Sequence, residues 1–237
     1  MKRPLLFLSL LLLPFYGCGG GGGNVAAINF PLTTQTRTVA TGDTATYAVS
    51  GTVRDNVTQQ VANITGTMTY TVGSSPFNNG VGNTITVAMN LTSSNNATIS
   101  RNQTSFFAQD NTRTMRKVGD NGGSNGALRV ANAPYIILPG SWSVGQSYTN
   151  LVQFDNNDSS TETFNVIGTE NVATPMGTFS AWKALETVNN NGGVQVNETS
   201  WYAPALATFV RSDISLVAPE GYTLTMTAVL SSTNIAL

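Results

Sequence analysis

The chain has no histidine, and its only cysteine is Cys18. Without histidine it cannot build Ser-His-Asp or Cys-His catalytic sites, and zinc sites made of histidine and cysteine are excluded as well. A single cysteine cannot form an intramolecular disulfide, so the fold must depend on its apolar core. We therefore expect no metal, no cofactor and no catalytic residue.

Charge is also scarce. Charged residues make up 10% of the chain, against about 25% in ordinary soluble proteins. The formal net charge is −1, and no basic stretch stands out, so nucleic acid is not expected as a partner. Asn, Thr, Ser and Gln supply the polarity instead, which is common in exported β-proteins.

The long apolar run of the chain lies at its N-terminus. Lys2 and Arg3 precede the apolar residues 4–16, which lead to Cys18 and the glycines at 19–23. A membrane-spanning helix needs about 20 apolar residues, and this run is shorter and contains two prolines. The pattern therefore indicates an export signal rather than a retained membrane helix.

This leader resembles a bacterial lipoprotein signal, in which residues 1–17 are removed and Cys18 becomes the lipid-modified first residue. The resemblance implies diacylglycerol and palmitate chains on Cys18, and more than one chain is needed because a single chain binds a membrane only marginally. Residues 18–29 would then form a flexible glycine-rich tether. Gly19, where an Asp would indicate retention in the inner membrane, favours the outer membrane by the same analogy, with its face undetermined. In the alternative, the signal is simply cleaved and Cys18 is incidental.

The rest of the chain alternates polar and apolar residues with a period of two. Residues 64–72, 83–92 and 221–231 alternate threonines with larger apolar side chains, which is typical of half-buried strands. Turn clusters of Gly, Asn and Asp separate such segments. About ten strands with short turns predict an all-β, antiparallel, strongly curved sheet or half-open barrel, with a β-sandwich as the alternative.

The β segments are expected to form a single domain over residues 30–237, because one all-β domain often contains 200–250 residues. The glycine-rich stretch 119–126 is the only candidate boundary within it. The preferred interpretation of that stretch is a long hairpin loop within one continuous sheet.

The C-terminal half carries a second resemblance, in residues 142–148, 168–179 and 201–204. These segments resemble uncharacterised families of bacterial exported β-proteins, in which G-x-E-x-V-x-x-P-x-G-T-F-x-A precedes W-Y-A-P-G-V-G. A tight turn is expected, with Gly177 in a left-handed conformation. Where the families have glycines after the last proline, this chain has Ala-Leu-Ala at 205–207, which predicts a more ordinary backbone. More distantly, such families resemble half-barrel lipid and lipoprotein carriers, an analogy of fold rather than of function.

Two carboxylates flank an expected hairpin turn. A two-residue turn at Asn191 and Gly192 would pair Glu186 with Asn197 and place Glu186 and Glu198 on opposite faces of the sheet. A three-residue loop would shift the register by one and set the two carboxylates side by side, as a carboxylate-dependent hydrolase requires. Such an enzyme would cluster several of the acidic residues Glu162, Glu170, Glu186, Glu198 and Asp213.

Three functions are open at this point. The favoured one is a non-catalytic, lipid-anchored module of the cell envelope that binds or scaffolds another molecule, such as an envelope protein. The second is a carrier that holds an apolar ligand in a half-barrel pocket, and the third is the carboxylate-dependent hydrolase. The aromatic candidates for a pocket wall are Phe106, Phe164, Trp182 and Trp201, although such rings more often belong to a core.

Overall fold

The structure, a computed structural model, describes residues 28–74, 83–94, 98–121 and 127–236. Cys18, the leader and most of the tether therefore lie outside the described residues. The strands are β1 (Asn29–Phe30), β2 (Thr44–Asp55), β3 (Val61–Ser74), β4 (Asn83–Ser93), β5 (Thr98–Gln109), β6 (Met115–Asp120), β7 (Arg129–Leu138), β8 (Ser147–Gln153), β9 (Ser159–Thr174), β10 (Gly177–Asn190), β11 (Gln195–Ala203), β12 (Thr208–Ala218) and β13 (Tyr222–Thr233).

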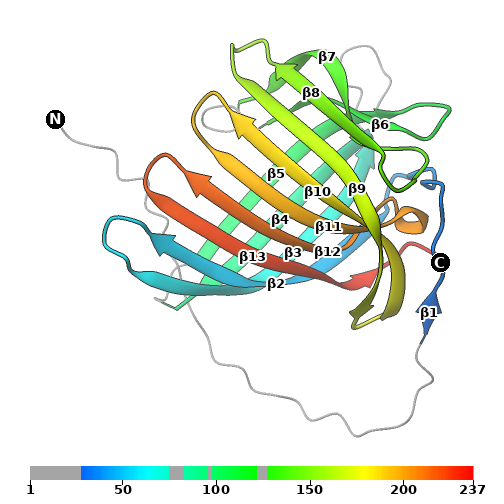
Figure 1. Cartoon of the computed structure of the whole chain (residues 1–237), viewed down its shortest axis with the longest axis horizontal. Coiled ribbons are helices and arrows are strands. Elements are labelled where there is room, and N and C mark those ends of the chain that lie inside the picture. Colours follow the sequence, from blue (N-terminus) through cyan, green and yellow to red (C-terminus); the bar gives the residue numbers. More distant parts are fainter. Residues whose placement is uncertain (1–27, 75–82, 95–97, 122–126, 237) are drawn as a thin grey trace, which may run out of the picture.

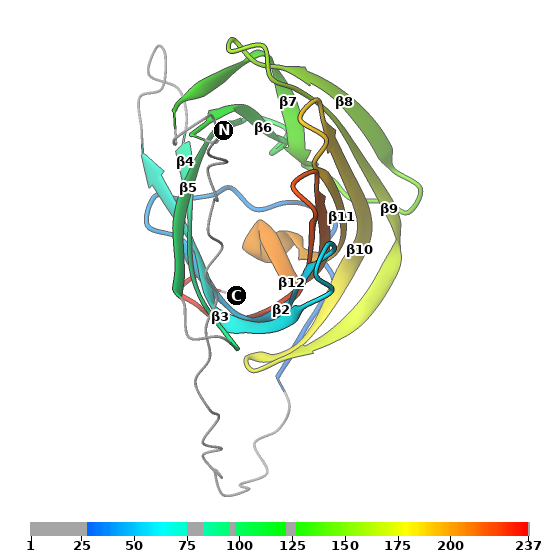
Figure 2. The same ribbon diagram turned by 90° about the vertical axis from the view of Figure 1, so that its left-hand side faces the viewer.

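Strands β2 to β13 form a nearly closed antiparallel barrel in which most neighbours in sequence are also neighbours in space. β2 pairs with β13, which brings the first and last barrel strands of the chain together in the middle of the sheet. Figure 1 shows β9 to β13 in front of β3, β4 and β5, and Figure 2 looks into the resulting ring. The two ends of the strand order, β7 and β8, share no ladder, and one isolated bridge joins Ala131 of β7 to Phe154, just after β8. The predicted curved antiparallel sheet is confirmed, with twelve barrel strands where about ten were expected.

Alternation explains how the barrel is filled. On β3 the apolar side chains of Ile64, Met68 and Val72 are buried, while the threonines between them are more exposed. Each strand thus contributes one apolar face to the interior, because successive side chains point to opposite faces of a sheet. One large cluster of buried apolar residues fills the barrel. The strands before and after the stretch 119–126, β6 and β7, are paired neighbours in the same sheet.

One end of the barrel, which we call the closed end, is covered by residues 33–39, 139–142 and 204–207. Thr36 Oγ1 donates to the carbonyl of Pro139 at 2.6 Å and accepts from the indole N–H of Trp142 at 2.9 Å. The Arg37 N–H bonds the carbonyl of Pro204 at 2.9 Å, at the start of the short 3₁₀ turn η2 (Pro204–Leu206). Figure 2 shows this turn, in orange, inside the ring of strands.

Two backbone predictions have different outcomes. Gly177 has φ 134°, and a Cβ there would lie 2.4 Å from the carbonyl oxygen of Ile28, so the predicted left-handed glycine is confirmed and close packing also requires it. The expectation of an ordinary backbone after Pro204 is wrong. Ala207 has φ 53°, a left-handed conformation, because it ends the η2 turn and bonds back to Pro204.

Candidate functional site

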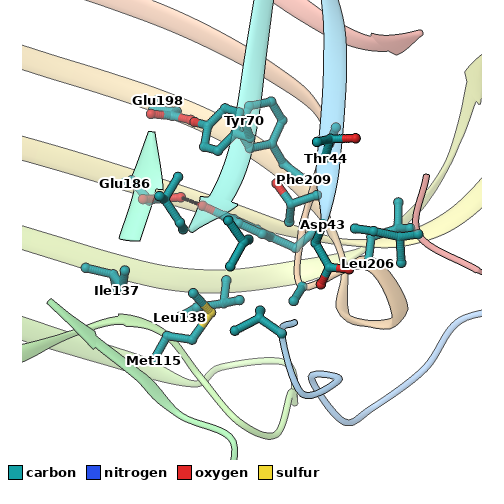
Figure 3. A pocket seen from close by; sticks show the side chains of 18 residues that line it. Asp43, Thr44, Tyr70, Met115, Ile137, Leu138, Glu186, Glu198, Leu206 and Phe209 are labelled. Carbon is teal, nitrogen blue, oxygen red and sulfur yellow. Dashed lines mark hydrogen bonds between the residues drawn. The ribbon is translucent and has the colours of Figure 1, made fainter. Parts of the chain in front are cut away.

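A cavity of about 250 Å³ lies within the barrel next to the closed end (Figure 3). Its polar lining consists of Asp43, Thr44 and Thr208, the carboxyl groups of Glu186 and Glu198, and the tyrosines Tyr70 and Tyr202. The apolar lining residues are Val39, Ala45, Val72, Ile85, Met115, Ile137, Leu138, Leu206, Ala207, Phe209 and Ile235. None of these lining residues is a lysine or an arginine, so the ionisable groups of the lining are carboxyls and phenols.

Glu186 on β10 and Glu198 on β11 are directly paired across the hairpin. Asn190 and Val194 close the hairpin through an N–H to carbonyl bond of 3.1 Å, and Gly193 has φ 82°. The loop therefore has three residues, and it gives the register that sets the two carboxyl groups side by side. A three-residue hairpin loop commonly places glycine in the left-handed conformation, which is the position of Gly193. Figure 3 shows both glutamates at one side of the cavity, away from Leu206.

Hydroxyl groups hold both carboxyls in place. The Tyr202 hydroxyl donates to Glu186 Oε1 at 2.6 Å. The hydroxyls of Ser200 and Ser212, both fully buried, donate to Glu198 Oε1 at 2.6 Å each. Sequence reasoning missed the two serines, because their role depends on the pairing of β11 with β12.

The electrostatics of the pair favour a neutral acid at Glu186. Burial is the main cause that raises the pKa of Glu186 well above its ordinary value, and the neighbouring Glu198 raises it further. The hydrogen bond from Tyr202 acts in the opposite direction but does not outweigh burial. Among the described residues, no lysine or arginine forms an ion pair with either glutamate. Glu186 therefore keeps its proton at pH values where an ordinary glutamate is ionised, and the protonated carboxyl can donate a hydrogen bond into the cavity.

Aromatic rings form part of the wall beside the carboxyl groups. Tyr70 packs edge-on against Phe209 with ring centroids 5.6 Å apart, and Tyr202 packs against Phe209 at 6.4 Å. The pKa of the Tyr70 hydroxyl is raised mainly by burial, and also by Tyr47 and the two glutamates. The phenol of Tyr70 is thus a neutral hydrogen-bonding group at the cavity.

The four aromatic residues expected at a pocket wall are not among the residues that line this cavity. The aromatic side chains that line it are Tyr70, Tyr202 and Phe209. Phe164 is buried, stacks on Tyr148 at 4.8 Å and belongs to the main core. Trp182 is also in that core, and its indole N–H donates to the carbonyl of Thr33 at 2.7 Å. Phe106 is half-buried on β5, next to a fully buried Phe107.

Trp201 lies on the outer side of the barrel. Its ring is sandwiched between the Lys183 ammonium at 4.9 Å and the Arg211 guanidinium at 4.8 Å. Its indole N–H donates to Glu170 Oε2 at 3.0 Å, and Glu170 also pairs with Lys183 at 2.9 Å. This cation–π arrangement explains why Trp201 is only 5% exposed although its charged neighbours face solvent.

The acidic candidates divide between the two faces. Glu170 and Asp213 pair with basic residues on the outer face, whereas Glu186 and Glu198 meet inside the barrel. Glu162 is also largely buried, which raises its pKa, and it accepts a hydrogen bond from Ser160 at 3.1 Å. Within the described ranges, no three His, Cys, Asp or Glu side chains are grouped so that they could hold a metal ion. In the same ranges, no helix has the length and apolar character needed to cross a membrane.

Comparisons with known proteins give structural neighbours only. No family profile and no curated protein matches the sequence. A Bacteroides fragilis protein described as exported, with a YmcC-like fold, is 14% identical; the match covers 85% of this chain and 100% of that one, with a TM-score of 0.43. A β-barrel-like protein of a domain of unknown function from Brucella abortus is 12% identical, with 86% and 100% covered and a TM-score of 0.42. The lipoprotein YmcC of Escherichia coli, described as hypothetical, is 14% identical, with 83% and 92% covered and a TM-score of 0.34. No statement about the function of the present chain follows from similarity at this level.

Proposed function

We propose that the chain is a non-catalytic, lipid-anchored binding protein of the bacterial cell envelope that carries a small amphipathic ligand in its barrel. The observation that carries the proposal is the cavity beside the closed end, whose walls are mostly apolar and which has Glu186 and Glu198 with their tyrosine neighbours at one side. Binding sites for small molecules have this composition, in which apolar walls provide affinity and a few polar groups set orientation.

The charge of the lining limits the ligand. Because no basic residue lines the cavity and two carboxyl groups stand side by side on β10 and β11, an anionic group would be buried there without a counter-charge. A hydroxyl or an amine can instead donate to the carboxyl oxygens, or accept from the proton that Glu186 retains. A volume of about 250 Å³ suits a short alkyl chain or a small ring system with such a polar end.

The position of β1, near the start of the described chain, supports anchoring at the closed end. The described chain begins at Ile28, and β1 pairs in parallel with the start of β10, where Phe30 stacks on Phe179 at 4.2 Å. A lipid on Cys18 would therefore hold the closed end of the barrel toward the bilayer, through the glycine-rich residues 18–27. We place the protein in the outer membrane on the basis of Gly19, and the signature in residues 168–179 and 201–204 supports membership of the exported families it resembles.

A pair of valine variants on β3 tests the cavity. Val72 lines the cavity and is buried, so Val72→Phe should fill part of the space and weaken binding of the neutral fluorophore N-phenyl-1-naphthylamine at least tenfold. Val61 lies on the same strand but is 58% exposed, so Val61→Phe should bind like the wild type. Overpacking a core costs about 1–3 kcal/mol, so thermal unfolding of both variants is measured in parallel. Equal fluorophore affinity in a folded Val72→Phe protein would contradict the proposal.

A carboxylate-dependent hydrolase is the second candidate, and the register of the β10–β11 hairpin is the observation in its favour. Glu186 and Glu198 are directly opposed on neighbouring strands, so their two carboxyl groups lie on the same face of the sheet, as the paired carboxyls of retaining glycosidases must. A neutral Glu186 would act as the acid and Glu198 as its partner. The test is hydrolysis of a panel of aryl glycosides. Turnover that disappears in both Glu186→Gln and Glu198→Gln would establish the enzyme and replace the binding proposal.

A further inference from the structure

The contact between β7 and β8 differs from the other strand contacts of the barrel. The other neighbouring barrel strands within the described residues share ladders, although the β6–β7 ladder is interrupted between Lys117 and Gly119. Between β7 and β8 there is only an isolated antiparallel bridge, from Ala131 on β7 to Phe154, the residue that follows β8. We call this contact the seam. One further backbone bond crosses near it, from the N–H of Asp155 to the carbonyl of Val130 at 2.9 Å.

Side chains replace the missing ladder at the seam. The amide of Asn150 on β8 donates to the carbonyl of Ile136 on β7 at 2.9 Å. Arg129 on β7 pairs with Asp158 at 3.3 Å and lies over the ring of Phe154 at 4.1 Å. Asp158 is 43% exposed, and an ion pair at such a site contributes only about 0–1 kcal/mol. Opening the seam therefore breaks these side-chain contacts and the packing of a small apolar cluster rather than a row of backbone hydrogen bonds.

The seam also has a small apolar cluster of its own. Ala131, Tyr135, Val152 and Phe154 are buried together, separately from the main core. The Tyr135 hydroxyl is the polar group of this cluster, and its pKa is raised mainly by burial and then by the nearby Glu162. Segments with few buried contacts of their own can open without unfolding the rest of a protein.

The seam adjoins the cavity. Ile137 on β7 packs against both the small cluster and the main core, and it lines the cavity together with Leu138. Figure 3 shows both side chains at the edge of the cavity. The closed end, by contrast, is covered by residues 33–39 and 204–207, which are tied to the barrel by buried hydrogen bonds.

We propose that the seam is a lateral portal through which the ligand reaches the cavity, an inference that rests on the binding function proposed above. Separation of β7 from β8 beside Ile137 leads directly to the cavity wall, and the ligand can pass sideways into the barrel without disturbing its closed end. During this opening β7 stays paired with β6, and β8 stays paired with β9.

A reversible cross-link tests the portal. Ala131 and Phe154 are an antiparallel pair, and the Cα separation of such pairs, about 4.5–5.5 Å, lies within the range for disulfides. The double variant Ala131→Cys/Phe154→Cys is made in the full chain with Cys18→Ser, so that the introduced cysteines carry the only thiols. Oxidation should slow the association of N-phenyl-1-naphthylamine at least tenfold, and reduction should restore the rate.

The matched control locks a complete ladder. Thr52 on β2 and Thr225 on β13 are paired, and their hydroxyls lie 2.8 Å apart on the outer face, so Thr52→Cys/Thr225→Cys can also form a disulfide. Its oxidation should leave the association rate unchanged. Equal rates for the oxidised and reduced seam variant would overturn the portal alone and indicate that the ligand enters elsewhere. Absence of fluorophore binding in the wild type and in both reduced variants would overturn the binding function and the portal together.

Discussion

The variant Glu186→Gln should be more stable than the wild type, and its advantage should grow as the pH rises. Gln has nearly the same size, and its amide oxygen can accept the hydrogen bond that Tyr202 donates to Glu186 in the wild type. The substitution therefore removes the ionisation of one buried group and little else. The pKa of Glu186 is raised in the folded protein, mainly by burial and then by Glu198, above an ordinary value of 4.5.

The sign and size of the effect follow from proton linkage. A carboxyl whose pKa is raised on folding contributes its full stability below about pH 4.5, and that contribution is lost as the pH rises toward the raised pKa. Within this window the unfolded chain has released the proton and the folded one has retained it. The wild type should therefore lose about 1.4 kcal/mol per pH unit relative to Glu186→Gln, and the difference should level off above the raised pKa.

Urea unfolding followed by tryptophan fluorescence, from pH 4 to pH 8, measures this difference directly. Glu170→Gln is the control, because Lys183, and then Trp201, lowers the pKa of Glu170 on the outer face. Its contribution is present above about pH 4.5 and is lost on acidification, so the difference between the wild type and Glu170→Gln should stay nearly constant over this range and decrease only at its acid end. A wild-type minus Glu186→Gln difference that does not change with pH, or a Gln variant that is less stable at pH 7, would refute the reasoning.

Three further predictions concern the closed end and the outer face. Ala207→Gly should stabilise the protein by about 0.5–1 kcal/mol in urea unfolding, because the left-handed conformation is strained for alanine; a loss of stability would contradict this. Thr36→Val should destabilise it by about 1–3 kcal/mol in the same assay, since the buried indole N–H of Trp142 loses its acceptor; an unchanged midpoint would show that the bond is unimportant. Lys183→Met should raise the pKa of Glu170 toward its ordinary value in a carboxyl NMR titration, and an unchanged pKa would disprove the assigned cause.

The general architecture could be predicted from local patterns. Alternation in stretches such as 64–72 is set by the pleat of a strand, and turn clusters of Gly and Asn mark where strands end. The barrel follows because one face of each strand is apolar and must be buried. The sequence also indicated a left-handed Gly177, since a glycine that follows a proline turn can take that conformation.

The candidate site could be predicted only as one of two alternatives. Whether Glu186 faces Asn197 or Glu198 depends on one residue of loop length, and the run of Asn and Gly at 190–193 permits both turns. The serines that hold Glu198 come from two strands whose pairing is set by tertiary structure. The closed end likewise depends on contacts between residues more than a hundred positions apart, such as Thr36 with Trp142, which no local pattern reveals.

Competition among three eight-carbon ligands tests the central claim most directly. Octylamine, octanol and octanoate have similar chains and differ in the charge of the polar end that would meet Glu186 and Glu198. At pH 7 the amine and the alcohol should displace bound N-phenyl-1-naphthylamine, and octanoate should not, because no basic residue lines the cavity. Displacement by octanoate as effective as that by octylamine, or displacement by none of the three, would contradict the account.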